Sequence, residues 1–411
     1  MDFSQSNSEQ NNQRPDQPKT ATNFASKRFG IYILGAGFSK SAGLPLAPEL
    51  WAEVRRRGLE MSERASLFRD DLNTYIEYKK ECDRIDLAPE QVNFEDFMAF
   101  LDVEHYLGLR GKETWSSHGN EAQVVVKTLI GEILTERMPS KDKIPEIYLQ
   151  FAKILKPDDF ILTFNYDVLL ERALEAANVS YRLFPDRLKQ DPESKRPLPL
   201  VDTSKEEVIV LKLHGSIDWF DRTLYNQLEE DRIANGFAPG GPDLIFQKPE
   251  EFGALPLIEG PHYPDDPLHQ IYRIRDIERL YQRRILFHAT LSLLNPSPLK
   301  ILYSQMLRNF WWGLGYAGVL NFSMAIIGFS LPSQDEYARQ VIYRLVKNYQ
   351  TTYWENDVWT HKKTPLVLVD LRKSAQEKQE FQSRYAFVDW DRAETYFEGF
   401  DKKAIGLLLC R

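Results

Sequence analysis

Five short apolar runs are spaced along the chain. They are Ile31–Leu34, Phe160–Phe164, Val208–Leu213, Met324–Ile327 and Leu366–Val369. Each run is rich in β-branched or aromatic residues and is closed by a Gly, Asn, His or Asp. Continuous rather than alternating apolar runs are typical of strands buried on both faces. The sequence therefore predicts a parallel sheet covered by helices, with buried helix segments as the alternative for individual runs.

Helix-start signals follow two of these runs. Ser333 and Glu336 have the spacing of a capping box, and apolar residues recur after them at helical intervals. The stretch Asp167–Ala176 also predicts a helix. Repeated strand–turn–helix units of this kind indicate an α/β fold with a Rossmann-like parallel sheet.

Three regions lie outside this pattern. Residues 1–28 are rich in Gln, Asn and Ser and predict a flexible tail, which leaves 29–411 as one domain. Residues 50–155 look helical, with Asn93 as a helix N-cap. Residues 222–320 mix Pro-rich loops with a helix expected over Ile274–Leu294. We interpret both long stretches as insertions on the sheet rather than as separate domains.

Composition excludes several classes of protein. The net charge of −8 argues against a protein that coats nucleic acid, which needs concentrated positive charge. Cys82 and Cys410 are the only cysteines, too few for a disulfide framework or a four-cysteine zinc site. No apolar run reaches membrane-spanning length, and the N-terminus lacks the order of a secretory signal. We therefore expect a soluble, cytoplasmic chain.

A glycine turn closes the first apolar run. Gly35 and Gly37 stand where a tight strand-to-helix turn could approach a diphosphate closely, with backbone N–H groups and the helix dipole holding the anion. A full dinucleotide fingerprint would have glycine at Lys40, and the third glycine is Gly43. No acidic residue closes a second short strand about twenty residues later, which weakens the ordinary dehydrogenase interpretation. An ordinary glycine turn in a buried sheet is the alternative.

Polar residues end the second and third runs. Asn165 follows one run and His214 follows the other, and the carboxyl ends of parallel strands face the crevice where open α/β sheets bind ligands. The Asn165 amide could hold a water or a ribose hydroxyl, and His214, which titrates near neutral pH, could act as a base. The alternatives are that Asn165 caps the next helix and that His214 is a satisfied core histidine.

These residues resemble those of the sirtuins. Gly35–Ser39 with Gly43-Leu44-Pro45 resembles the sirtuin glycine motif, Asn165-Tyr166-Asp167 its Asn-Ile-Asp element, and His214-Gly215 its catalytic His-Gly. Gly328-Phe329-Ser330-Leu331 resembles a later cofactor-contacting turn, and Leu366–Asp370 the last strand, which ends near the adenosine. The four motifs occur in family order between residues 30 and 372, and neither long insertion is covered.

The departures from the family bear on the activity. Protein-deacetylating sirtuins carry a zinc ribbon of two Cys-x-x-Cys pairs, which this chain cannot build, and Leu46-Ala47-Pro48 stands where deacetylases usually have Phe-Arg. The sequence is similar to bacterial sirtuin-like defence effectors. That resemblance implies hydrolysis of NAD⁺ to nicotinamide and ADP-ribose without a metal, depleting NAD in an infected cell by abortive infection. It also implies a homo-oligomer, or a partner such as a HerA-like ATPase.

The resemblance assigns roles to particular residues. Asn165 and His214 are the expected catalytic residues. The expected cofactor contacts are Gly35, Ala36, Gly37, Phe38, Ser39, Asp167, Gly328, Ser330 and Asp370. In this interpretation the amides of Ala36 and Gly37 hold the diphosphate and Asp370 binds a ribose hydroxyl. Asp167 could instead serve only the start of its helix, and Asp370 could be a strand-end carboxylate facing water. Two other functions stay open: an NAD-dependent deacylase or ADP-ribosyltransferase, and a non-catalytic sensor of NAD or ADP-ribose.

Overall fold

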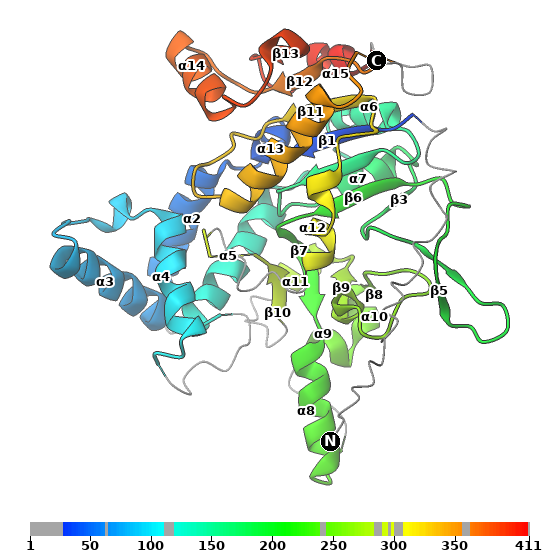
Figure 1. Ribbon diagram of the computed structural model, residues 1–411. Coiled ribbons are helices and arrows are strands. Elements are labelled where there is room, and N and C mark those ends of the chain that lie inside the picture. The colour runs from blue at the N-terminus through cyan, green and yellow to red at the C-terminus, as the bar shows by residue number, and fades with distance from the viewer. Residues whose placement is uncertain are drawn as a thin grey trace, which may run out of the picture.

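A seven-stranded parallel sheet forms the centre of the chain (Figure 1), in the order β13-β12-β11-β1-β2-β6-β3. Its strands are β1 (Gly30–Leu34), β2 (Phe160–Thr163), β3 (Tyr181–Arg182), β6 (Val208–Lys212), β11 (Ser323–Ile327), β12 (Leu366–Val369) and β13 (Ala393–Tyr396). The structure is a computed structural model and describes residues 28–61, 65–110, 119–238, 244–282, 290–294, 297–299, 307–355 and 362–409. The predicted tail therefore lies outside the described residues except for Arg28.

The five apolar runs form the five inner strands of this sheet, so the predicted α/β fold is confirmed. Every residue of β1, β6 and β12 is buried, which requires cover on both faces of the sheet. The two edge strands were not predicted. β3 has only two residues, and β13 is largely half-exposed, so neither shows a continuous apolar run.

Helices cover the sheet and project from it. They are α1 (Ala36–Lys40), α2 (Ala47–Glu60), α3 (Ala65–Cys82), α4 (Phe94–Tyr106), α5 (Glu121–Arg137), α6 (Glu146–Ile154), α7 (Leu169–Ala176), α8 (Thr223–Ala234), α9 (Leu244–Gln247), α10 (Pro249–Phe252), α11 (Ile277–Gln282), α12 (Arg308–Trp311), α13 (Glu336–Thr351), α14 (Ala375–Arg384) and α15 (Lys402–Leu409). Figure 1 shows α3 and α4 projecting from the side of the molecule. Asn93 caps α4 as expected, accepting from the Asp96 amide at 3.0 Å. Among the described residues, no helix is long and apolar enough to cross a membrane.

The region 222–320 differs from the prediction at one point. A helix was expected over Ile274–Leu294, but Ile274 ends strand β9 (Ile271–Ile274) and Thr290–Leu293 forms strand β10. Both strands pair antiparallel with β7 (Gly215–Asp221) in a second sheet, completed by β8 (Ala254–Pro256). Between them, α11 (Ile277–Gln282) is helical as predicted, and residues 283–289 lie outside the described residues. Pairing with distant strands has overridden the local helical pattern at the two ends of the predicted helix. Strands β4 (Leu188–Gln190) and β5 (Pro197–Val201) form a separate hairpin.

The start of α13 also differs from the prediction. Asp335, rather than Ser333, is the N-cap residue, and its carboxylate accepts from the Ala338 amide at 3.4 Å. The expected capping box of Ser333 and Glu336 is therefore wrong, and the N-cap lies two residues later in the chain than predicted. The shift matters for the site, because it places a buried carboxylate at the carboxyl edge of the sheet.

The strand order reverses at β1. From β1 the chain continues on one side to β2 and β6, and only later on the other side to β11 and β12. In open parallel sheets, ligands bind beyond the carboxyl ends of the strands at such a reversal. Leu34, Thr163 and Ile327 end the strands around it, and the residues after them form the site described next.

Candidate functional site

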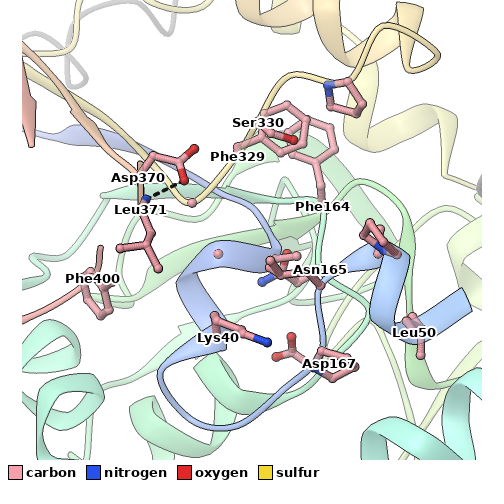
Figure 2. A pocket seen from close by; sticks show the side chains of 18 of the residues that line it. Lys40, Leu50, Phe164, Asn165, Asp167, Phe329, Ser330, Asp370, Leu371 and Phe400 are labelled. Atoms are coloured by element: carbon pink, nitrogen blue, oxygen red, sulfur yellow. Dashed lines mark hydrogen bonds between the residues drawn. The ribbon is translucent and has the colours of Figure 1, made fainter. Parts of the chain in front are cut away.

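A cavity of about 530 Å³ lies beyond the carboxyl ends of β1, β2, β6, β11 and β12. This volume is within the range of small-molecule sites in proteins. Most of the predicted site residues line it: Ala36, Gly37, Asn165, Asp167, His214, Gly328, Ser330 and Asp370. Figure 2 shows Asp370 and Phe400 on one side of α1 and Asn165 on the other. The fold thus brings residues more than 300 positions apart to one cavity.

Two glycine turns contact each other directly beneath the cavity. The Gly35 amide donates to the Ile327 carbonyl at 3.0 Å, and the Gly37 amide donates to the Gly328 carbonyl at 2.9 Å. A Cβ atom on Gly37 would lie 2.7 Å from the Gly328 Cα. Gly328 has a φ of +63°, and its own Cβ would lie 2.1 Å from the Phe38 nitrogen. The close approach of the two turns is therefore sufficient to require these glycines.

The expected cofactor contacts at the glycine turn divide into two groups. Gly37 lines the cavity, but its amide is already engaged by Gly328, which differs from the expected role as a diphosphate donor. Ala36 also lines the cavity, and as the first residue of α1 its amide has no acceptor within that helix. Phe38 points into the core, where its ring packs on Tyr148 at a centroid distance of 5.2 Å. Ser39 is buried, and its hydroxyl accepts from the Asn165 amide. Gly35, Phe38 and Ser39 therefore do not line the cavity, although all three were expected as cofactor contacts.

Asn165 directly faces the glycine turn. Its Nδ2 donates to the Gly35 carbonyl at 3.0 Å and to the Ser39 hydroxyl at 3.1 Å, and the residue is 9% exposed. These two bonds fix the side-chain rotation and assign the nitrogen to the turn, because a carbonyl can only accept. The amide oxygen Oδ1 is thereby the part of Asn165 available to a bound molecule. Asn165 does not cap α7, whose N-cap residue is Val168.

His214 pairs with a carboxylate that the sequence analysis did not identify. Its Nε2 lies 3.1 Å from the Asp335 Oδ2, and both side chains are buried. The pair joins the turn after β6 to the N-terminus of α13, so the two groups come from elements 121 positions apart. The acidic residue is visible in the sequence, but the expected capping box assigned the helix start to Ser333. A carboxylate against an imidazole fixes the ring and stabilises its protonated form.

A buried ion pair supports the segment that carries Asn165. The Lys212 Nζ lies 2.8 Å from the Glu171 Oε1 and also donates to the Asp167 carbonyl. Burial raises the pKa of Glu171, and the Lys212 charge opposes that rise. The Asp167 Oδ1 accepts from the Leu169 amide at 3.0 Å, as a helix-start residue does. Asp167 therefore performs the structural role that the sequence left open, while it also lines the cavity.

Aromatic rings enclose the His214 end of the cavity. Phe164 and Phe329 stack with a centroid distance of 4.4 Å, and the His214 ring meets Phe164 edge-on at 5.0 Å. Tyr166 donates to the Leu294 carbonyl at 2.8 Å, and burial raises its pKa, so it stays a hydrogen-bond donor. These rings keep the histidine away from bulk water and offer a flat apolar surface to a ligand.

The opposite end of the cavity is charged. Asp370 follows β12; its Oδ1 accepts from the Leu371 amide at 2.7 Å, drawn in Figure 2, and its Oδ2 accepts from Arg372 at 3.0 Å. Burial raises the pKa of Asp370, and Arg372 opposes the rise. The Ser330 carbonyl accepts from the Arg384 Nη1 at 3.3 Å, so the β11–α13 turn is tied to α14. Asp370 therefore faces both the cavity and a guanidinium.

One family model matches part of this chain, and several solved structures are similar to it. Residues 159–233, from the start of β2 to α8, match the family model of a SIR2-like domain, and the match contains Asn165 and His214. No curated protein matches the chain. The chain is similar to a solved structure described as the structural basis of sirtuin substrate affinity. The two share 13% identity over 93% of both chains, with a TM-score of 0.31. The chain is also similar to a Sir2 homologue mutant in complex with ADP-ribose, with 12% identity, 94% and 92% coverage and a TM-score of 0.31.

Proposed function

We propose that this chain binds NAD⁺ in the cavity and hydrolyses the bond between nicotinamide and ribose. The observation that carries the proposal is the meeting of Asn165 with the His214–Asp335 pair at one end of the cavity. The SIR2-like match over 159–233 supports it, because it covers the first two of these residues. The Sir2 structures entitled as complexes with ADP-ribose and with NAD⁺ suggest the class of ligand.

The length of the cavity favours a dinucleotide. Three strand spacings separate β12 from β2 and four separate β12 from β6, which is about 14 Å and about 19 Å. A mononucleotide would reach from one end to the middle, whereas NAD⁺ would extend from Asp370 past the glycine turns to His214. The diphosphate would then lie beside Ala36, whose amide has no acceptor within α1.

The chemistry at the His214 end follows from the contacts there. In the proposed reaction a water oxygen forms a bond to the ribose C1′ while the bond from C1′ to the nicotinamide nitrogen breaks. The electron pair of that bond neutralises the pyridinium, so nicotinamide leaves as a neutral molecule. His214 accepts a proton from the water, and the Asp335 carboxylate stabilises the resulting imidazolium. The Asn165 oxygen positions the water or the ribose hydroxyls.

The purified chain, incubated with NAD⁺ both alone and together with the product of its genomic neighbour, tests the proposal. We expect the active form to release nicotinamide and ADP-ribose in equal amounts, with and without an acetyl-lysine peptide. Release that requires the peptide would instead identify a deacylase. Tight binding of NAD⁺ without release, measured by calorimetry alongside product analysis, would identify a sensor.

We further propose that NAD⁺ depletion serves defence against phage and that assembly controls it, through self-association or through a partner such as a HerA-like ATPase. An unrestrained NAD⁺ hydrolase would harm its own cell. Apolar side chains at the end of α4 offer a surface: Tyr106, Leu107 and Leu109 are 63%, 61% and 65% exposed. We expect cellular NAD⁺ to fall only when the chain is expressed with its genomic neighbour during infection. Full depletion by a chain that stays monomeric and is expressed alone would contradict this control.

A further inference from the structure

The charged end of the cavity is lined by two carboxylates, Asp370 and Glu398, and two guanidinium groups, Arg372 and Arg384, of which Asp370 and Arg372 form a hydrogen-bonded pair. The Arg372 Nη2 donates to the Asp370 Oδ2 at 3.0 Å. The Arg372 Nε is buried and has no hydrogen-bond partner among the described residues. The guanidinium also lies 5.3 Å above the Phe381 ring, which holds its plane. Asp370 and Arg372 both line the cavity. An arginine that is held by a carboxylate and an aromatic ring, and whose charge that carboxylate neutralises, thus stands at the cavity wall.

The orientation of the bound dinucleotide determines which half of it contacts Asp370 and Arg372. If the bond to be cleaved lies at Asn165 and His214, the adenosine half must extend toward β12, since that is where the cavity continues. The inference therefore rests on the proposed function. In the adenosine half, the ribose carries neighbouring 2′- and 3′-hydroxyls, and a carboxylate accepts hydrogen bonds from such a pair.

We propose that Asp370 makes the site selective for NAD⁺ over its 2′-phosphorylated form, NADP⁺, and that Arg372 is a phosphate-binding group whose charge Asp370 neutralises. A free 2′-hydroxyl donates to the carboxylate. A 2′-phosphate brings about two negative charges against the same oxygen atoms, and like charges in contact repel each other strongly. Arginine binds phosphate through its planar donors once no carboxylate competes for them.

The test removes the charge of Asp370 and measures affinity for both ligands. Calorimetry on the full chain would use ADP-ribose and 2′-phospho-ADP-ribose, which contain no bond to nicotinamide and are not consumed. We expect the wild-type chain to bind ADP-ribose at least about tenfold more tightly. Asp370→Asn keeps an acceptor for the Leu371 amide and should reduce that ratio by about tenfold or reverse it. Asp370→Ser is a second variant, in case the introduced amide pairs poorly with the guanidinium.

Two further variants separate the pair from general charge effects. Asp370→Asn combined with Arg372→Leu should lose the gained affinity for the 2′-phosphate. Glu398→Gln removes a negative charge from the same end of the cavity, and should change the ratio by less than about threefold. Equal affinity of the wild type for both ligands, or an unchanged ratio in folded Asp370→Asn, would overturn the inference and leave the proposed function standing. A folded wild type that binds neither ligand would overturn both.

Discussion

The two walls of the cavity are built from different parts of the chain. On the wall formed by β1 and β11, backbone meets backbone: Gly37 and Gly328 touch through their main chains, and a side chain on either would clash. On the wall formed by β2, β6 and α13, polar side chains are buried. Asn165, His214 and Asp335 lose their hydration there, and apolar side chains would not bear that cost.

This difference shows where the functional evidence lies. Packing alone accounts for the glycines, so they do not by themselves require a ligand. Packing does not account for the buried contact between His214 and Asp335. The cap of α13 uses one carboxylate oxygen of Asp335, and an apolar side chain in place of His214 would fill the space beside the other oxygen without burying a second polar group. The comparison predicts that substitutions on the polar wall affect chemistry and that substitutions on the glycine wall affect stability.

The largest expected effect is on the polar wall. His214→Ala and Asn165→Ala should each lower the rate of nicotinamide release by about 10²–10⁴, the usual contribution of a positioned acid–base group. Thermal unfolding would show that both variants fold. His214→Gln keeps a donor near Asp335 and guards against destabilisation from an unpaired carboxylate.

Asn348→Ala is the matched control. Its Nδ2 also donates to two acceptors, the Gly315 and Ala317 carbonyls at 3.1 and 2.8 Å, and it does not line the cavity. We expect this variant to lose stability while each folded molecule keeps its turnover. Near-normal turnover in purified His214→Ala or Asn165→Ala would remove that residue from the mechanism.

A smaller effect is expected at Asp335. Asp335→Asn should lower kcat by about tenfold to a hundredfold, since a hydrogen bond to a charged group contributes about 1.5–3 kcal/mol. KM should change little, because Asp335 acts through His214 rather than on the ligand. The asparagine oxygen still accepts from the Ala338 amide, so the cap of α13 is kept. Steady-state kinetics that show a raised KM with unchanged kcat would argue for a purely structural role.

On the glycine wall, Gly37→Val should prevent NAD⁺ binding, and the structure adds that it should also destabilise the fold. The new side chain would collide with Gly328, where a Cβ already comes within 2.7 Å, and overpacking costs about 1–3 kcal/mol. Gly406→Ala in α15 is the control, because nothing lies within 4 Å of its added Cβ and alanine favours a helix by about 0.5–1 kcal/mol. Denaturant unfolding and NAD⁺ calorimetry on both variants measure the two effects. Unchanged stability and NAD⁺ affinity in Gly37→Val would place the ligand elsewhere.

The smallest expected effect is that of metal removal. Cleavage of NAD⁺ should proceed at the same rate after dialysis against a chelator, because nicotinamide leaves as a neutral group and the polar wall supplies the base. The two cysteines cannot form a four-cysteine site. Loss of activity on chelation, restored by one added metal, would contradict this mechanism.

The polar and glycine walls also differ in how far the sequence predicts them. Continuous apolar runs predicted the inner strands. Asn165 and His214 were predicted to lie at the site because each follows one of these runs, and both line the cavity. Asp335 was missed, because its partner lies on another element and only the folded chain brings them together. Phe38 was expected at the cofactor but packs in the core, since helical position within α1 cannot be read from the motif alone. The residues of β10 were expected in a helix because their pairing with β7 is invisible to local periodicity.

The central claim is hydrolysis of NAD⁺ by water that His214 activates, and one measurement tests it most directly. The purified chain, alone and with the product of its genomic neighbour, would be incubated with NAD⁺ in oxygen-18-labelled water and the products weighed by mass spectrometry. The account predicts nicotinamide together with ADP-ribose that carries one labelled oxygen on the ribose C1′, and neither product from His214→Ala. Intact NAD⁺ in both conditions, or unlabelled ADP-ribose attached to another molecule, would contradict it.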